Sequence, residues 1–134
     1  MKKREQEFIN QFQKWLVINS DILWPGKSIV YEAKFCMGMT IPFSAIRKHQ
    51  VQALQLAEMN KVIYKIPDSG FEQKPFDGFL ITKALAFIII KFYKKRIKTF
   101  YMIPISSLIK CLSCKGKKSL SQNDCLVFGK EYSL

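Results

Sequence analysis

Apolar residues near the start of the chain recur at the three- and four-residue spacing of one helix face. These residues are Phe8, Phe12, Trp15 and Leu16. Their spacing predicts a helix over 4–18. A second helix is predicted over 45–60, where Ser44 is a good N-cap residue and an apolar face recurs at helical spacing.

Short runs of β-branched and aromatic residues predict the strands. The runs cover 27–35, 62–64, 76–82, 84–93 and 99–105. The stretch 84–90 is wholly apolar, which is typical of a central strand buried on both faces. A turn is predicted at 67–70, a short helix over 106–112, and a last helical turn over 122–127 capped by Ser121.

The order of these elements predicts an α/β fold with a single mixed β-sheet flanked by helices. The chain has 134 residues, which suits one domain over 1–134, with a basic loop and C-terminal segment over 115–134. Its 49% hydrophobic and 24% charged residues exclude a disordered chain or a fibre. The longest apolar run is far shorter than the ~20 residues that span a bilayer, and no signal peptide is readable. We therefore expect a cytoplasmic protein without a membrane partner.

Charge is the most unusual bulk property of the chain. It has 22 Lys and Arg residues against 10 Asp and Glu residues, a formal net charge of +12. Such an excess favours a polyanionic partner, nucleic acid first, although a charge that only aids solubility is the alternative. The candidate DNA-binding residues are Arg47, Lys48, Lys94, Lys95, Arg96, Lys98, Lys117 and Lys118.

Four cysteines raise the question of a zinc site. Cys111 and Cys114 form a C-x-x-C pair, Cys125 stands alone, and the single histidine, His49, is distant in sequence. A structural zinc site usually needs two close pairs of ligands. We therefore expect these cysteines to be reduced and to act as small apolar side chains.

The most suggestive polar motif is an E-x-K inside a predicted strand. Glu32 and Lys34 are two residues apart, so their side chains share one face of the strand. A carboxylate can bind a hard divalent cation, and a lysine can stabilise charge on a phosphate. The alternative interpretation is a salt bridge on an exposed edge strand.

Two further residues extend this motif. Gln50 lies on the inward face of the second helix, where it can reach the strand, although a hydrogen-bonded core glutamine is the alternative. Asp77 follows a proline and precedes Gly78, whose lack of a side chain leaves room for a close neighbour. It is a candidate second carboxylate for a cation site, or else a turn aspartate before a strand.

Four segments resemble a known family. Residues 31–34 (YEAK) and 42–54 (PFSAIRKHQVQAL) are similar to the core of RecU-type Holliday junction resolvases, members of the PD-(D/E)XK nuclease superfamily. Residues 84–90 resemble the apolar strand after the family's helix, and 116–120 (GKKSL) resemble a segment near its end. The resemblance is specific around 31–54 and looser elsewhere.

The resemblance implies a PD-(D/E)XK core and a Mg²⁺- or Mn²⁺-dependent DNA endonuclease. By it, Glu32 and the Ala33 carbonyl are metal ligands, Lys34 is the catalytic lysine, and Gln50 matches the helix glutamine. The superfamily's aspartate normally precedes the E-x-K strand, where this chain has Asp21. The segment around Asp77 looks more like that aspartate strand, so we favour Asp77 as a metal ligand. Glu5 is the candidate for the acid that the superfamily often carries on its first helix.

The sequence thus favours a junction resolvase that cuts branched DNA as a homodimer, since resolution takes two symmetric cuts. Two alternatives stay open. One is a nuclease-fold protein that binds nucleic acid without cleaving it. The other is a restriction or repair nuclease that acts on a different DNA substrate.

Overall fold

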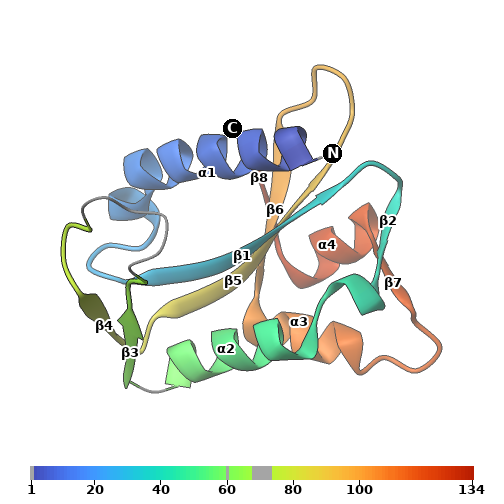
Figure 1. Cartoon of the computed structure of the whole chain (residues 1–134). Helices are drawn as coiled ribbons and strands as arrows, with labels where there is room; N and C mark the ends of the chain where they lie inside the picture. Colours follow the sequence, from blue (N-terminus) through green and yellow to red (C-terminus); the bar gives the residue numbers. More distant parts are fainter. Residues whose placement is uncertain (1, 60, 68–73) are drawn as a thin grey trace.

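The computed structural model describes residues 2–59, 61–67 and 74–134 (Figure 1). Its helices are α1 (Lys2–Leu23), α2 (Lys48–Met59), α3 (Ile105–Leu112) and α4 (Gln122–Phe128), with a 3₁₀ turn η1 (Phe43–Ala45) before α2. Its strands are β1 (Ile29–Cys36), β2 (Thr40–Pro42), β3 (Lys61–Lys65), β4 (Gly78–Thr82), β5 (Leu85–Phe92), β6 (Thr99–Pro104), β7 (Ser119–Ser121) and β8 (Lys130–Ser133). Most of the turn predicted at 67–70 lies outside the described residues.

The main sheet has four strands in the order β1-β5-β6-β8. β1 runs parallel to β5, and the other neighbours are antiparallel, so the sheet is mixed as predicted. A parallel pair needs a long crossover, and here α2 and the β3–β4 hairpin supply it. The hairpin forms its own two-stranded sheet, and β2 pairs with β7 in another. The expectation of a single sheet was therefore wrong.

Helices cover both faces of the main sheet, which is why β5 is apolar from Leu85 to Ile90. Figure 1 shows α1 on one side and α2 and α3 on the other. The α1 side is packed with aromatic rings: the centre of the Phe12 ring lies 4.8 Å from that of Tyr31 and 5.6 Å from that of Phe100. The opposite side is mainly aliphatic and includes Ile88 and Ile103. Each such side chain stabilises the fold by about 1.5–3 kcal/mol through burial.

Several element boundaries differ from the prediction. α1 continues to Leu23 although Val17, Ile18 and Ile22 point to solvent on its outer side. The second helix begins at Lys48 instead of residue 45 because Ile46 is extended and separates η1 from α2. Ser44 is therefore not its N-cap.

The C-terminal segment contains more regular structure than the sequence pattern predicted. The sequence pattern missed β7 and β8, of which β8 closes one edge of the main sheet. The predicted cap of α4 is confirmed: Ser121 accepts a hydrogen bond from the Asp124 amide at 3.1 Å, and the Asp124 carboxylate accepts one from the Ser121 amide at 2.9 Å. Within the described part of the chain, no helix is long and apolar enough to cross a membrane.

Candidate functional site

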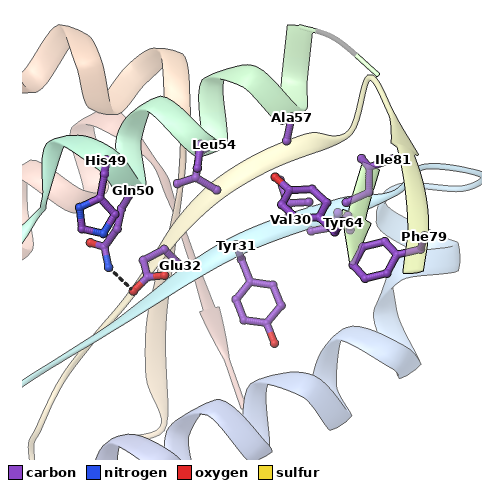
Figure 2. A pocket seen from close by; sticks show the side chains of 12 residues that line it. Val30, Tyr31, Glu32, His49, Gln50, Leu54, Ala57, Tyr64, Phe79 and Ile81 are labelled. Carbon is purple, nitrogen blue, oxygen red and sulfur yellow. Dashed lines mark hydrogen bonds between the residues drawn. The ribbon is translucent and has the colours of Figure 1, made fainter. Parts of the chain in front are cut away.

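β1 and α2 bring three of the predicted site residues together. Glu32 and Lys34 alternate with residues that face α1, so both side chains point toward α2. Gln50, in the first turn of α2, lies between them. Its Nε2 donates to Glu32 Oε1 at 2.9 Å (Figure 2). Its Oε1 accepts from Lys34 Nζ at 2.9 Å. The amide therefore joins the acid and the base of the E-x-K motif.

These contacts determine how the amide of Gln50 is oriented. Lys34 can only donate and an ionised Glu32 can only accept, so the amide oxygen must face the lysine and its nitrogen the carboxylate. The same oxygen also accepts from the Arg47 backbone amide at 3.4 Å, which ties the side chain to the start of its own helix. Gln50 is thus held from three sides.

Glu32 and Lys34 keep some access to water. Their side chains are 35% and 17% exposed, and Lys34 Nζ lies 3.6 Å from Glu32 Oε1. The salt bridge named as the alternative interpretation is therefore present, on an edge strand of the main sheet. Among the described residues, every hydrogen bond and ion pair to the Glu32 carboxylate uses Oε1. Its Oε2 has no such partner among these residues.

Glu32 and Gln50 stand at one end of a pocket of about 430 Å³, and Lys34 adjoins them without lining it. Glu32, His49 and Gln50 form its polar end, whereas the rest is mainly apolar and aromatic (Figure 2). The apolar end is formed by Ile29, Val30, Ala53, Leu54, Ala57, Tyr64, Phe79 and Ile81. The Tyr31 ring turns away to α1, where its hydroxyl accepts from Gln13 at 2.9 Å.

The fold does not place the Asp77 side chain beside Glu32, where the second metal-binding carboxylate was predicted. Its side chain is 98% exposed and pairs with Lys74 at 3.2 Å, and it lies on the rim of a different hollow. Its carbonyl accepts from the Ile66 amide at 2.8 Å, next to the hairpin. The turn aspartate was the alternative interpretation of this residue, and this placement matches it. Gly78 does leave room for a close neighbour, because a Cβ there would collide with the Tyr64 carbonyl.

The other acidic candidates lie on α1, across the sheet from Glu32. Glu5 is half-buried and Asp21 is exposed, and neither lines the pocket. Ala33 is buried, and its side chain packs on the α1 side. Among residues 2–59, 61–67 and 74–134, no group of three or more His, Cys, Asp or Glu side chains lies close together.

The basic candidates occupy separate places. Arg47 and Lys48 are exposed at the start of α2, next to Gln50 in the chain. The group at 94–98 forms the β5–β6 loop, which Figure 1 shows far from the loop over 115–118. In that second loop Lys117 is already paired with Asp124 at 2.6 Å. Arg47 and Lys48 are therefore the basic residues best placed to serve the site.

The cysteines behave as apolar filler for the most part. Cys111 in α3 and Cys125 in α4 are buried, whereas Cys114 is exposed. Burial raises the pKa of the Cys125 thiol to about 12, so the thiol is neutral at physiological pH.

The sequence pattern missed the aromatic wall of the pocket. Tyr64 and Phe79 come from β3 and β4 and lie opposite each other in the hairpin register. The run of β-forming residues over 62–64 was the available signal, but it does not tell where the hairpin docks. A scan against protein-family models finds no match for this chain, and a search of the curated proteins finds no similar sequence.

Proposed function

We propose that the protein is a Mg²⁺- or Mn²⁺-dependent nuclease that hydrolyses phosphodiester bonds in DNA at Glu32, Lys34 and Gln50. The observation that carries the proposal is the Gln50 amide, which joins the Glu32 carboxylate and the Lys34 ammonium at the polar end of the pocket. The RecU-like segments and the charge of +12 support DNA as the substrate. By the same resemblance, the core is of PD-(D/E)XK type and the substrate is branched DNA, cut by a homodimer.

The donor set suits a hard cation. Mg²⁺ keeps several water ligands and often binds through one or two carboxylates together with substrate phosphate. Glu32 Oε2 and the Ala33 carbonyl would hold it, and the substrate phosphate would complete the site. We leave Asp77 and Glu5 out of the proposed metal site because Asp77 is exposed and paired with Lys74, and Glu5 lies on α1, across the sheet from Glu32. When bound, such a cation supplies Lewis acidity and lowers the pKa of a water molecule.

Each side chain of the cluster then has one task. Lys34 places a positive charge beside the phosphate and stabilises the negative charge that grows there during hydrolysis. Gln50 is a positioning residue, because its two hydrogen bonds hold Lys34 and Glu32 at a set spacing. Arg47 and Lys48 contact the backbone phosphates on either side without reading base identity.

The second candidate function is nucleic-acid binding without cleavage. A single carboxylate in the described pocket favours it, because two-carboxylate sites hold a cation more firmly. This candidate predicts salt-sensitive binding of DNA that does not change with Mg²⁺.

Cleavage assays separate the two functions. A labelled four-way junction and a matched linear duplex are incubated with the protein in Mg²⁺ and in EDTA. We expect the junction to be cut in Mg²⁺ alone and Glu32→Gln and Lys34→Met to be inactive, whereas Asp77→Asn cuts like the wild type. Faster cutting of the linear duplex would indicate a restriction or repair nuclease. Binding without any cutting would indicate the second candidate.

A further inference from the structure

The apolar end of the pocket has a role that phosphate chemistry does not explain. Tyr64 and Phe79 face each other there with ring centres 5.6 Å apart and ring planes 26° from parallel. Figure 2 shows both rings at one end of the pocket, with Glu32 and Gln50 at the other end. The Phe79 side chain is 45% exposed although it belongs to the pocket wall. The wall therefore offers apolar ring surface to an occupant.

The occupant must combine a flat apolar group with a negative charge. Rings of the wall and the aliphatic surface of Val30, Leu54 and Ile81 suit a flat apolar group. The formal charge of +12 and the neighbouring Lys34, Arg47 and Lys48 suit an anion. Each nucleotide of a nucleic acid carries both features, a flat base and a charged phosphate. Bases stack on aromatic side chains whatever their sequence.

We propose that the pocket binds one unpaired nucleobase, placing the adjacent phosphate beside Glu32 and Lys34. The position of the phosphate rests on the proposed function, whereas the base pocket does not. A base within a duplex is covered by its neighbours and must leave the stack to enter such a pocket. The volume of about 430 Å³ lies at the lower end of the range for small-ligand pockets. The preferred substrate is therefore a strand with unpaired bases, such as a single strand, a flap or an open junction.

The β3–β4 hairpin provides matched controls for this proposal. Leu80 and Ile63 pair with each other on the outer side of the same hairpin, at 58% and 73% exposure, and neither lines the pocket. Removing their side chains changes the apolar surface of the hairpin but leaves the wall intact. Phe79→Ala and Tyr64→Ala remove the wall itself.

The test measures binding in EDTA, so that cleavage plays no part. Fluorescence anisotropy gives the Kd of a short labelled single strand and of the same strand with every base replaced by an abasic sugar. We expect the wild type to bind the base-bearing strand more tightly. Phe79→Ala should reduce that advantage by about fivefold or more, the loss typical of one stacked base. Leu80→Ala and Ile63→Ala should keep it.

Two results would overturn the base pocket: equal Kd values for the two strands with the wild type, or the same loss in Leu80→Ala as in Phe79→Ala. If Phe79→Ala does not fold, as judged by circular dichroism, Phe79→Leu takes its place and should show the same loss. Base-dependent binding without any cleavage in Mg²⁺ rejects the nuclease proposal alone. Cleavage without base-dependent binding rejects the base pocket alone.

Discussion

Gln50→Leu is the substitution that most sharply tests the hydrogen-bonded cluster of β1 and α2. Leucine has a side chain of similar size, but it is apolar and cannot replace either hydrogen bond of the amide. Glu32 and Lys34 then lose their shared partner. We expect the protein to become less stable and the two charged side chains to lose their fixed spacing.

The loss can be estimated from the contacts. Each hydrogen bond to a charged partner contributes about 1.5–3 kcal/mol when its groups are shielded from water. Gln50 makes two such bonds, at 2.9 Å each. Water can replace part of both, because Glu32 and Lys34 are 35% and 17% exposed. We therefore expect a net loss of about 1–2 kcal/mol, or roughly 4–8 °C in the melting temperature of a domain of this size.

Urea unfolding monitored by circular dichroism measures this loss. Gln52→Leu is the matched control, because Gln52 lies in the same helix with its side chain in solvent. A double-mutant cycle with Lys34→Met isolates the coupling between the amide and the lysine. Equal stability of Gln50→Leu and Gln52→Leu would refute the reasoning, as would a coupling energy below about 0.5 kcal/mol.

Two further predictions concern the C-terminal segment. Burial raises the pKa of the Asp124 carboxyl, but hydrogen bonds from Lys117 and Ser121 outweigh it and hold this pKa below 3.8. Urea unfolding should show Asp124→Ala to be about 1 kcal/mol less stable than the wild type at pH 6. This difference in stability should narrow as the pH falls below 3.8, because the Asp124 carboxylate then becomes protonated. A difference that does not change with pH would contradict the role of these hydrogen bonds. In Ellman titration at pH 8, Cys114 should react at once and Cys125 only after unfolding; rapid reaction of Cys125 would contradict its burial.

Local spacing was enough to predict the cluster. Glu32 and Lys34 share a face because strand side chains alternate, and Gln50 faces inward because helix positions repeat every 3.6 residues. Both rules operate within one element. The parallel pairing of β1 with β5 then fixes the side of the sheet that α2 covers, and the three side chains meet.

Predictions that depended on how elements dock were less successful. Asp77 was placed beside Glu32 on the assumption that its strand joins the main sheet, but β4 pairs with β3 in a separate hairpin. The strand β8 was missed because Lys130 and Glu131 break the apolar pattern of a strand. This segment becomes a strand through its pairing with β6. The end of α1 was missed because Val17 and Ile18 lie outside the apolar face that gives the pattern. Such features follow from tertiary contacts.

The most direct test of the nuclease proposal is the single-turnover rate of DNA cleavage with and without Mg²⁺, for the wild type and for Glu32→Gln. Glutamine keeps the size of the side chain and removes its charge. We predict that the wild type cuts in Mg²⁺ and stops in EDTA, and that Glu32→Gln falls to the uncatalysed background while its fold is unchanged. Cleavage by Glu32→Gln at the wild-type rate would contradict the proposal, as would a wild type that binds DNA in Mg²⁺ and leaves every strand intact.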